Sequence, residues 1–216
     1  DELRIVLVGK TGGGKTSIRN FLLEEKVSGW IPPTTKCGIY RGECGGQKLA
    51  VIDTPGVFNI NMTKKEVLPE IAKCMILAQP GPHVFLYVAD AMTFTQEDQE
   101  SMKIIQDVFG SNYKDHTLAV FLSGTKPDGD PNIELGFRGG YYLCDTNDKS
   151  SKARSELLEK IMELVRKNKG EHYTYEAFEE AKKVVEKEKA KKKTDSVSDD
   201  MIEALINAFM GDTYAR

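Results

Sequence analysis

The stretch GKTGGGKT, from Gly9 to Thr16, follows directly on the apolar run LRIVLV at residues 3–8. It fits the pattern G-x-x-x-x-G-K-[ST] at the end of a strand, which is typical of loops that hold a nucleotide polyphosphate. The glycines let backbone N–H groups point inward with no Cβ to block phosphate oxygens. Lys15 can reach the β- and γ-phosphates, and the Thr16 hydroxyl can hold Mg²⁺.

A helical pattern that begins near Lys15 adds the positive end of a helix dipole to this loop. The alternative is a flexible glycine turn that fits the pattern by chance. The strand pattern before it and the helix pattern after it oppose that alternative. The predicted phosphate-binding residues are Gly9, Lys10, Thr11, Gly12, Gly13, Gly14, Lys15, Thr16 and Ser17.

Length and composition predict one domain with appendages, because the chain has 216 residues, of which 40% are hydrophobic. The net charge of −3 gives no general attraction to nucleic acid or acidic membranes. No apolar run approaches the ~20 residues that span a bilayer, and there is no signal-peptide pattern. The cysteines form no C-x-x-C pair, so we expect reduced thiols in a cytoplasmic protein.

Alternating strand and helix patterns predict an α/β fold with a mainly parallel twisted sheet and helices on both faces. Strands are expected at residues 3–8, 39–44, 48–53, 84–89, 118–122 and 141–144, and helices at 16–25, 64–77, 95–109 and 151–168. Ligands bind such sheets beyond the carboxyl ends of the strands. We therefore expect the glycine-rich loop, Asp53 and residues 123–128 to converge on one crevice.

The composition changes after about residue 173, where Glu, Lys and Ala become frequent. This change predicts a globular domain over residues 1–173 and a helical C-terminal extension over residues 174–216. Two interpretations of the extension stay open. It is either a solvated charged helix, or a helix that docks on the domain or on a second copy of the chain.

A second motif, Asp53-Thr54-Pro55-Gly56, supplies D-x-x-G at the end of a predicted strand. Asp53 can hold Mg²⁺ through water, and the Gly56 N–H can meet the γ-phosphate. Such a contact orders or releases the next loop according to whether the third phosphate is present. Thr34 is the favoured switch-loop residue for completing the Mg²⁺ shell, and Thr35 is the alternative.

A third motif, Thr125-Lys126-Pro127-Asp128, fits the pattern [NT]-K-x-D that selects guanine. The Asp128 carboxylate can accept hydrogen bonds from both guanine N1–H and N2–H₂, a donor pair that adenine lacks. Lys126 can lay its stem over the purine ring. The alternatives are an ordinary charged turn and an ATPase in which this motif is accidental. The order of the three motifs, each at a strand end, favours guanine.

Over residues 3–173 the chain resembles the GIMAP family, the GTPases of immunity-associated proteins, within the septin and chloroplast-import-receptor branch. The matching segments are LRIVLVGKTGGGKT, VIDTPGVF and, most specifically, CMILAQPGPHVFLYVADAMTFTQEDQ at Cys74–Gln99. The resemblance implies an AIG-type G domain that binds GTP or GDP with Mg²⁺ and dimerises through its nucleotide face. It also implies that Asn147, or Thr146, contacts guanine.

The chain departs from related GTPases at three places. Thr93 stands where some members carry an arginine that acts across the dimer, and Val57 where Ras-like enzymes have a water-orienting glutamine. The connection at residues 129–140 is shorter than in relatives. His83 is another acid–base candidate, although a loop histidine bonded to backbone is the favoured interpretation. The sequence therefore predicts slow GTP hydrolysis, with a non-hydrolysing, GTP-dependent scaffold as the alternative.

Overall fold

The computed structural model describes residues 1–9, 14–24, 37–54, 64–91, 96–122, 135–174, 187, 190, 199–203 and 206–207. Its strands are β1 (Leu3–Val8), β2 (Gly38–Cys44), β3 (Gln47–Asp53), β4 (Val84–Asp90), β5 (Thr117–Leu122) and β6 (Tyr141–Cys144). Its α-helices are α1 (Lys15–Leu22), α2 (Lys64–Leu77), α3 (Gln96–Phe109) and α5 (Ser151–Lys167), and a 3₁₀ helix, η2, spans Ser111–His116. None of the helices described is long and apolar enough to cross a bilayer.

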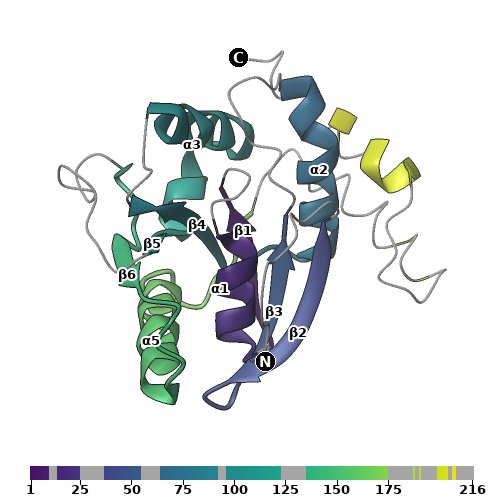
Figure 1. The fold of residues 1–216 in the computed structure, drawn as a ribbon. Coiled ribbons are helices and arrows are strands. Elements are labelled where there is room, and N and C mark those ends of the chain that lie inside the picture. Colours follow the sequence, from purple (N-terminus) through teal and green to yellow (C-terminus); the bar gives the residue numbers. More distant parts are fainter. Residues whose placement is uncertain are drawn as a thin grey trace.

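The strands form one sheet in the order β2-β3-β1-β4-β5-β6 (Figure 1). Among the strands that the structure describes, only β2 runs antiparallel, as the first arm of a hairpin with β3, and Gly45 and Gly46 turn that hairpin with positive φ values. The other neighbouring pairs are parallel, so β1, β3, β4 and β5 end at the same edge. This confirms the predicted α/β fold with a mainly parallel sheet.

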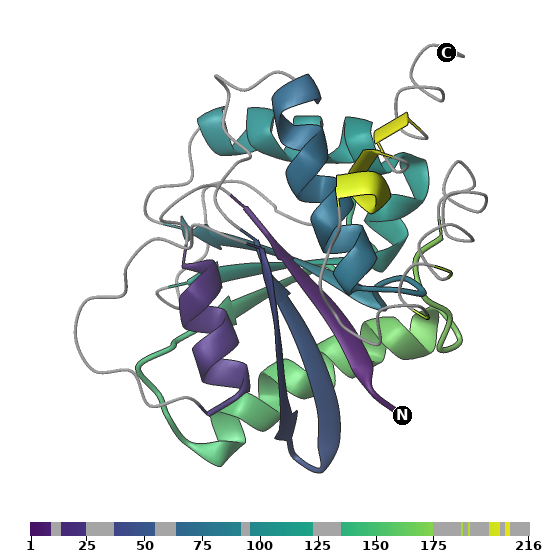
Figure 2. The ribbon, with the colours of Figure 1, turned by 90° about the vertical axis from the view of Figure 1, so that its right-hand side faces the viewer.

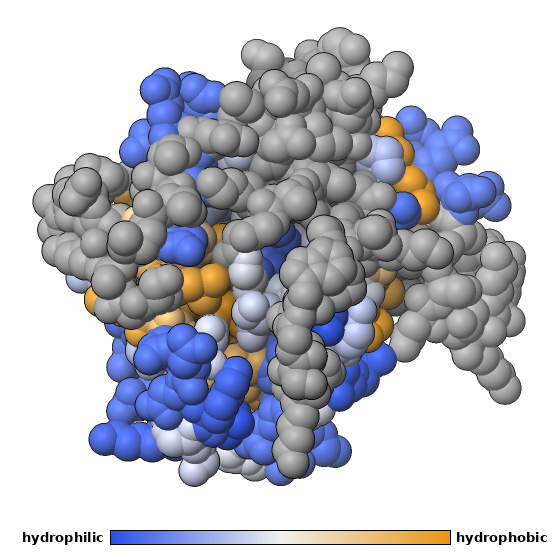
Figure 3. All heavy atoms as spheres, in the orientation of Figure 1, coloured by the Kyte–Doolittle hydropathy of each residue, from blue (hydrophilic) through white to orange (hydrophobic). Residues whose placement is uncertain are grey.

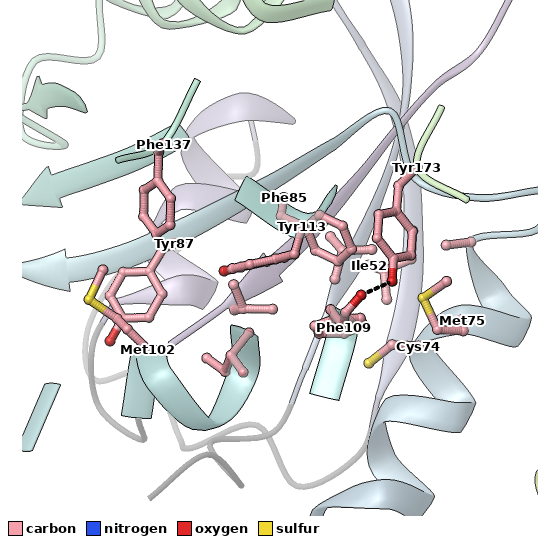
Figure 4. Packing of buried hydrophobic residues seen from close by; sticks show 14 of the residues in the cluster. Ile52, Cys74, Met75, Phe85, Tyr87, Met102, Phe109, Tyr113, Phe137 and Tyr173 are labelled. Carbon is pink, nitrogen blue, oxygen red and sulfur yellow. Dashed lines mark hydrogen bonds between the residues drawn. The ribbon is translucent and has the colours of Figure 1, made fainter. Parts of the chain in front are cut away.

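The helices cover both faces of the sheet, as predicted (Figure 2). Ile18, Phe21 and Leu22 of α1 share a buried cluster with apolar residues of α5 and one sheet face. The other face packs against α2 and α3, where large aromatic side chains fill the core (Figure 4). In the view of Figure 3, hydrophilic residues dominate the described surface around α5.

The end of helix α1 differs most from the sequence prediction, and the other boundaries of the predicted elements agree to within one residue. Helix α1 ends at Leu22 rather than at residue 25, because Glu24 adopts a left-handed conformation with φ 56° that a helix cannot continue through. Residue 95, where the sequence predicts the start of α3, lies outside the described residues. Strand β6 pairs in parallel with β5, so the short connection before it still permits a parallel crossover.

Two segments after α5 pack against the domain. Tyr173 is fully buried, its N–H donates to the Pro82 carbonyl, and its hydroxyl donates to the Phe109 carbonyl (Figure 4). Met201, in the helical turn at residues 199–203, belongs to the same core cluster as α2 and α3. Of the two interpretations of the extension, docking on the domain therefore holds for this turn. The boundary at residue 173 stays a prediction.

Candidate functional site

The glycine-rich loop begins and ends at glycines whose backbone conformation excludes a side chain. Gly9 follows β1 with φ 144°, and a Cβ there would lie 2.5 Å from the Val88 carbonyl oxygen of β4. Gly14 caps α1 with φ 91°, and a Cβ there would lie 2.0 Å from Leu122 Cδ1 at the end of β5. Gly9 and Gly14 therefore lie close against β4 and β5, which explains why glycine occupies both positions. Lys10, Thr11, Gly12 and Gly13 lie outside the described residues.

Lys15, the first residue of α1, points its ammonium group back toward the start of the loop. Its Nζ donates to the Gly9 carbonyl at 3.1 Å, and the residue is only 5% exposed. Burial lowers the pKa of Lys15 to about 8, and the nearby Asp53 carboxylate opposes that shift. A cation with so little water around it gains much from a bound phosphate. Ser17 lies in the same first turn of α1.

The first two motifs meet at a hydrogen bond between Thr16 and Asp53. The Thr16 hydroxyl donates to Asp53 Oδ2 at 2.9 Å, across 37 residues of sequence. Strand pairing produces this contact, because Asp53 ends β3 in register with Leu7 of the neighbouring β1. The adjoining Thr54 hydroxyl donates to the Leu7 carbonyl and fixes the end of β3. The Asp53 side chain is fully buried.

Arg19 completes this cluster, although the sequence analysis did not single it out. Its guanidinium donates to Asp53 Oδ2 at 3.1 Å and to Asn20 Oδ1, and it lies 3.9 Å from the centre of the Tyr40 ring on β2. The spacing in the sequence could have indicated that Arg19 belongs to the site, because it stands three residues after Thr16 and therefore on the same face of α1. The motif pattern ends at Thr16, so it does not extend to Arg19.

The structure describes few of the residues that are predicted to select guanine or to sense the γ-phosphate. Thr34, Gly56, Thr125, Lys126 and Asp128 lie outside the described residues, as do Thr35, Val57 and Thr93. However, Leu122, the last residue of β5, contacts the position of Gly14, so the segment that follows β5 starts beside the glycine-rich loop. Asn147 is exposed in a turn after β6, where its N–H donates to Asp145 Oδ1 at 3.0 Å.

His83 lies at the opposite edge of the sheet, just before β4 begins. Its Nδ1 accepts a hydrogen bond from the Arg4 N–H at 3.0 Å. Burial lowers the pKa of His83 to about 4, and Arg4, His172 and His116 lower it further. This confirms the interpretation of a loop histidine bonded to backbone, and it separates His83 from the glycine-rich loop.

The donor atoms at the carboxyl edge fit a phosphate with a divalent cation. A threonine hydroxyl and a carboxylate are hard oxygen donors, which Mg²⁺ prefers. A nearly buried ammonium and the start of α1 favour an anion beside them. Asp53 and Thr16 would hold the cation and Lys15 the phosphate, so the residues present suit both partners.

The fold is that of a P-loop GTPase G domain. It resembles the G domain of the FeoB iron transporter from T. maritima, with a TM-score of 0.52 and 18% identity over 76% of this chain and 99% of that one. A weaker likeness, with a TM-score of 0.48 and 24% identity over 76% of this chain and 63% of the other, is to Toc33 from Arabidopsis thaliana in complex with GDP and Mg²⁺.

Residues 3–134 match the model of the AIG1 family, so the chain belongs to that family. One relative, immune-associated nucleotide-binding protein 7 of Arabidopsis thaliana, is 38% identical over 131 residues, which are 56% of this chain and 40% of that protein. The chain spans 40% to 64% of the length of the first curated relatives it matches. The resemblance inferred from the motifs is thereby confirmed at the level of the family.

Proposed function

We propose that this chain binds GDP and GTP with Mg²⁺ and hydrolyses GTP slowly, as a nucleotide-dependent switch. The observation that carries the proposal is the Thr16–Asp53 hydrogen bond of 2.9 Å beside the buried Lys15. It joins the glycine-rich loop to the D-x-x-G segment at one sheet edge, where parallel α/β sheets bind their ligands. The relatives' name, nucleotide-binding protein, supports the nucleotide-binding part of this proposal.

Each described residue of the candidate site has a role in the proposed function. The glycine-rich loop wraps the phosphates, and the Lys15 ammonium contributes a positive charge to the β- and γ-phosphate oxygens. Thr16 and Asp53 hold Mg²⁺, directly or through water. The cation neutralises charge on the phosphates. Arg19 holds the Asp53 carboxylate in position against α1.

Guanine selection and the switch rest on residues outside the described part of the chain. The T-K-P-D motif supports selection by Lys126 and Asp128, and the family resemblance supports a further contact to guanine from Asn147 or Thr146. Gly56 and Thr34 are proposed to sense the γ-phosphate. The family resemblance supports a homodimer that forms through the nucleotide face.

Hydrolysis is proposed to be slow in the monomer, because Val57 cannot orient water and Thr93 cannot replace an arginine. The same two residues favour the alternative function, a GTP-dependent scaffold that assembles without hydrolysis. A single-turnover phosphate-release assay at low and high protein concentration separates the two. Release that rises with protein concentration supports a dimer-activated enzyme, and no release at any concentration supports the scaffold.

A fluorescent GDP titration tests binding itself. We expect saturable binding in Mg²⁺ buffer, loss of binding in Lys15→Ala, and competition by GTP but not by ATP. Lys48→Ala, which removes an exposed lysine of β3, is the matched control and should bind normally. Asp128→Asn should weaken GDP and favour xanthosine diphosphate. Failure of the wild-type chain to bind GDP, or a preference for ATP, would refute the proposal.

A further inference from the structure

Two thiols that are distant in sequence are in contact between the start of β2 and helix α2. Cys37 Sγ lies 3.3 Å from Cys74 Sγ, across 37 residues of sequence. Cys37 directly precedes β2 and is half-buried, whereas Cys74 lies in α2 and is 2% exposed. Cys74 belongs to the core cluster drawn in Figure 4, against which Cys37 also packs.

The contact needs little movement to become a covalent bond. A disulfide has its sulfur atoms about 2.0 Å apart, so these sulfurs must approach by roughly 1.3 Å. Cys37 precedes the first residue of a strand, where a side chain can turn without disturbing the sheet. A small reagent can reach the half-buried Cys37 thiol, and the buried Cys74 thiol is positioned to displace that reagent from Cys37.

We propose that Cys37 and Cys74 form a reversible intrachain disulfide by exchange with a low-molecular-weight disulfide. The Cys37 thiolate attacks one sulfur of the small disulfide, forms a mixed disulfide and releases one small thiolate. The Cys74 thiolate then attacks Cys37 Sγ and expels the second. The protein thiols are oxidised, the small disulfide is reduced to its two thiols, and the protons from Cys37 and Cys74 end on those thiols.

The remaining cysteines provide internal controls. Cys44 and Cys144 are both 2% exposed and belong to the core cluster on the opposite sheet face. Burial, with the nearby Glu24, raises the pKa of the Cys44 thiol, and burial raises the pKa of Cys144 to about 12. Thiols that stay protonated and covered react slowly, so oxidation should begin at the half-buried Cys37, and Cys74, 3.3 Å away, is placed to complete the bridge.

The bridge would join two elements, β2 and α2, each of which follows a segment that is proposed to respond to the γ-phosphate. Cys37 stands three residues after Thr34, and its neighbour Gly38 pairs with Asp53. Cys74 lies on α2, the helix that follows the D-x-x-G segment. A bond between them would restrict the rearrangement that distinguishes GTP from GDP. This consequence rests on the proposed function, whereas the disulfide itself does not.

The first experiment maps the disulfide in the full chain. The protein is incubated with oxidised glutathione, unfolded in slightly acidic denaturant with excess alkylating reagent so that every remaining thiol is blocked, and digested without reductant. We expect a Cys37–Cys74 linked peptide that dithiothreitol removes, with Cys44 and Cys144 still thiols. Cys44→Ser, the matched control, should form the same bridge, and Cys37→Ser should not. A stable glutathione adduct on Cys37 with Cys74 still alkylatable, or four unchanged thiols, would overturn the proposal; the wild-type map decides this even if a variant fails to fold.

The second experiment measures the affinities of the reduced and oxidised protein for GDP and for a non-hydrolysable GTP analogue. The affinity for one nucleotide divided by the affinity for the other should change about fivefold on oxidation, in the direction of equal affinities. This change lies in the lower range of typical coupling between sites. Cys37→Ser should show no change. An unchanged ratio in the bridged protein would refute the coupling to the switch. Absence of nucleotide binding by the reduced protein would refute the proposed function and leave the bridge unaffected.

Discussion

Raising the pH from 7 to 9 should weaken nucleotide binding through Lys15. Burial lowers the pKa of this ammonium to about 8, so the free protein loses the charge in this range. A bound phosphate places negative charge beside Lys15 and therefore keeps its ammonium group protonated. The nucleotide complex therefore binds more protons than the free protein above pH 7, and affinity must fall as pH rises.

The magnitude follows from the fraction of Lys15 that is charged. With a pKa of about 8, that fraction is roughly nine-tenths at pH 7 and one-tenth at pH 9, because one pH unit changes the ratio of the two forms tenfold. If only the charged form holds the phosphate, the Kd for GDP rises about tenfold between these pH values. At pH 8, binding should take up about half a proton.

Isothermal titration calorimetry in buffers of different ionisation enthalpy measures both quantities. Lys15→Arg is the matched control, because an arginine stays charged throughout this range. Its affinity is expected to be lower, because a bulkier guanidinium cannot take the buried place of the Lys15 ammonium beside the Gly9 carbonyl, but its Kd should change little with pH. Ionisation of the guanine base affects both proteins equally, so the difference between their slopes isolates Lys15. Equal slopes, or no proton uptake by the wild type at pH 8, would refute the reasoning.

Four further predictions test other parts of the structure. Gly9→Ala should lower the free energy of unfolding by more than ~2 kcal/mol, because its Cβ meets a backbone carbonyl, whereas Gly46→Ala, with positive φ but open space, should cost only ~1 kcal/mol in urea unfolding. Tyr173→Phe should cost about 1–3 kcal/mol in the same assay, since the Phe109 carbonyl loses a buried donor. His83 has a pKa of about 4, below its unfolded value, so the unfolded chain binds more protons between pH 6.5 and 4 and stability falls as pH falls; His83→Asn should show a smaller loss of Tm across that window. Arg19→Met should lower the Tm measured without nucleotide and enlarge the Tm gain from Mg²⁺ and GDP; equal gains in both proteins would contradict a role for Arg19 at the metal site.

Features set by local pattern could be predicted from the sequence. Strand β1 and the glycine-rich loop follow from an apolar run that stops at a G-x-x-x-x-G-K-T pattern, and Gly45-Gly46 predicts the hairpin of β2 and β3. The meeting of Thr16 with Asp53 was also predictable, since parallel strands end at one edge. These inferences need only the periodicity of apolar residues along the sequence and the chemistry of one motif at a time.

Contacts between distant segments could not be predicted in this way. Nothing local to Cys37 or Cys74 indicates that their sulfurs touch, because the contact depends on how α2 lies against β2. Likewise, the chain's three histidines, His83, His116 and His172, gather at the edge opposite the glycine-rich loop through the docking of residues 171–174. Such contacts depend on tertiary packing, for which a single sequence carries no periodic signal.

The role of Arg19 shows why a motif alone describes the site incompletely. The D-x-x-G pattern treats Asp53 as a metal ligand, but a fully buried carboxylate is costly unless other groups compensate its charge. Arg19, at 13% exposure, supplies that charge, and the Tyr40 ring holds the guanidinium in place. A bound Mg²⁺ would bring a second cation to the same carboxylate, so the two positive charges would repel at short range. Arg19 therefore stabilises the fold before metal binds and opposes the metal afterwards, which couples the stability of α1 to occupancy of the site.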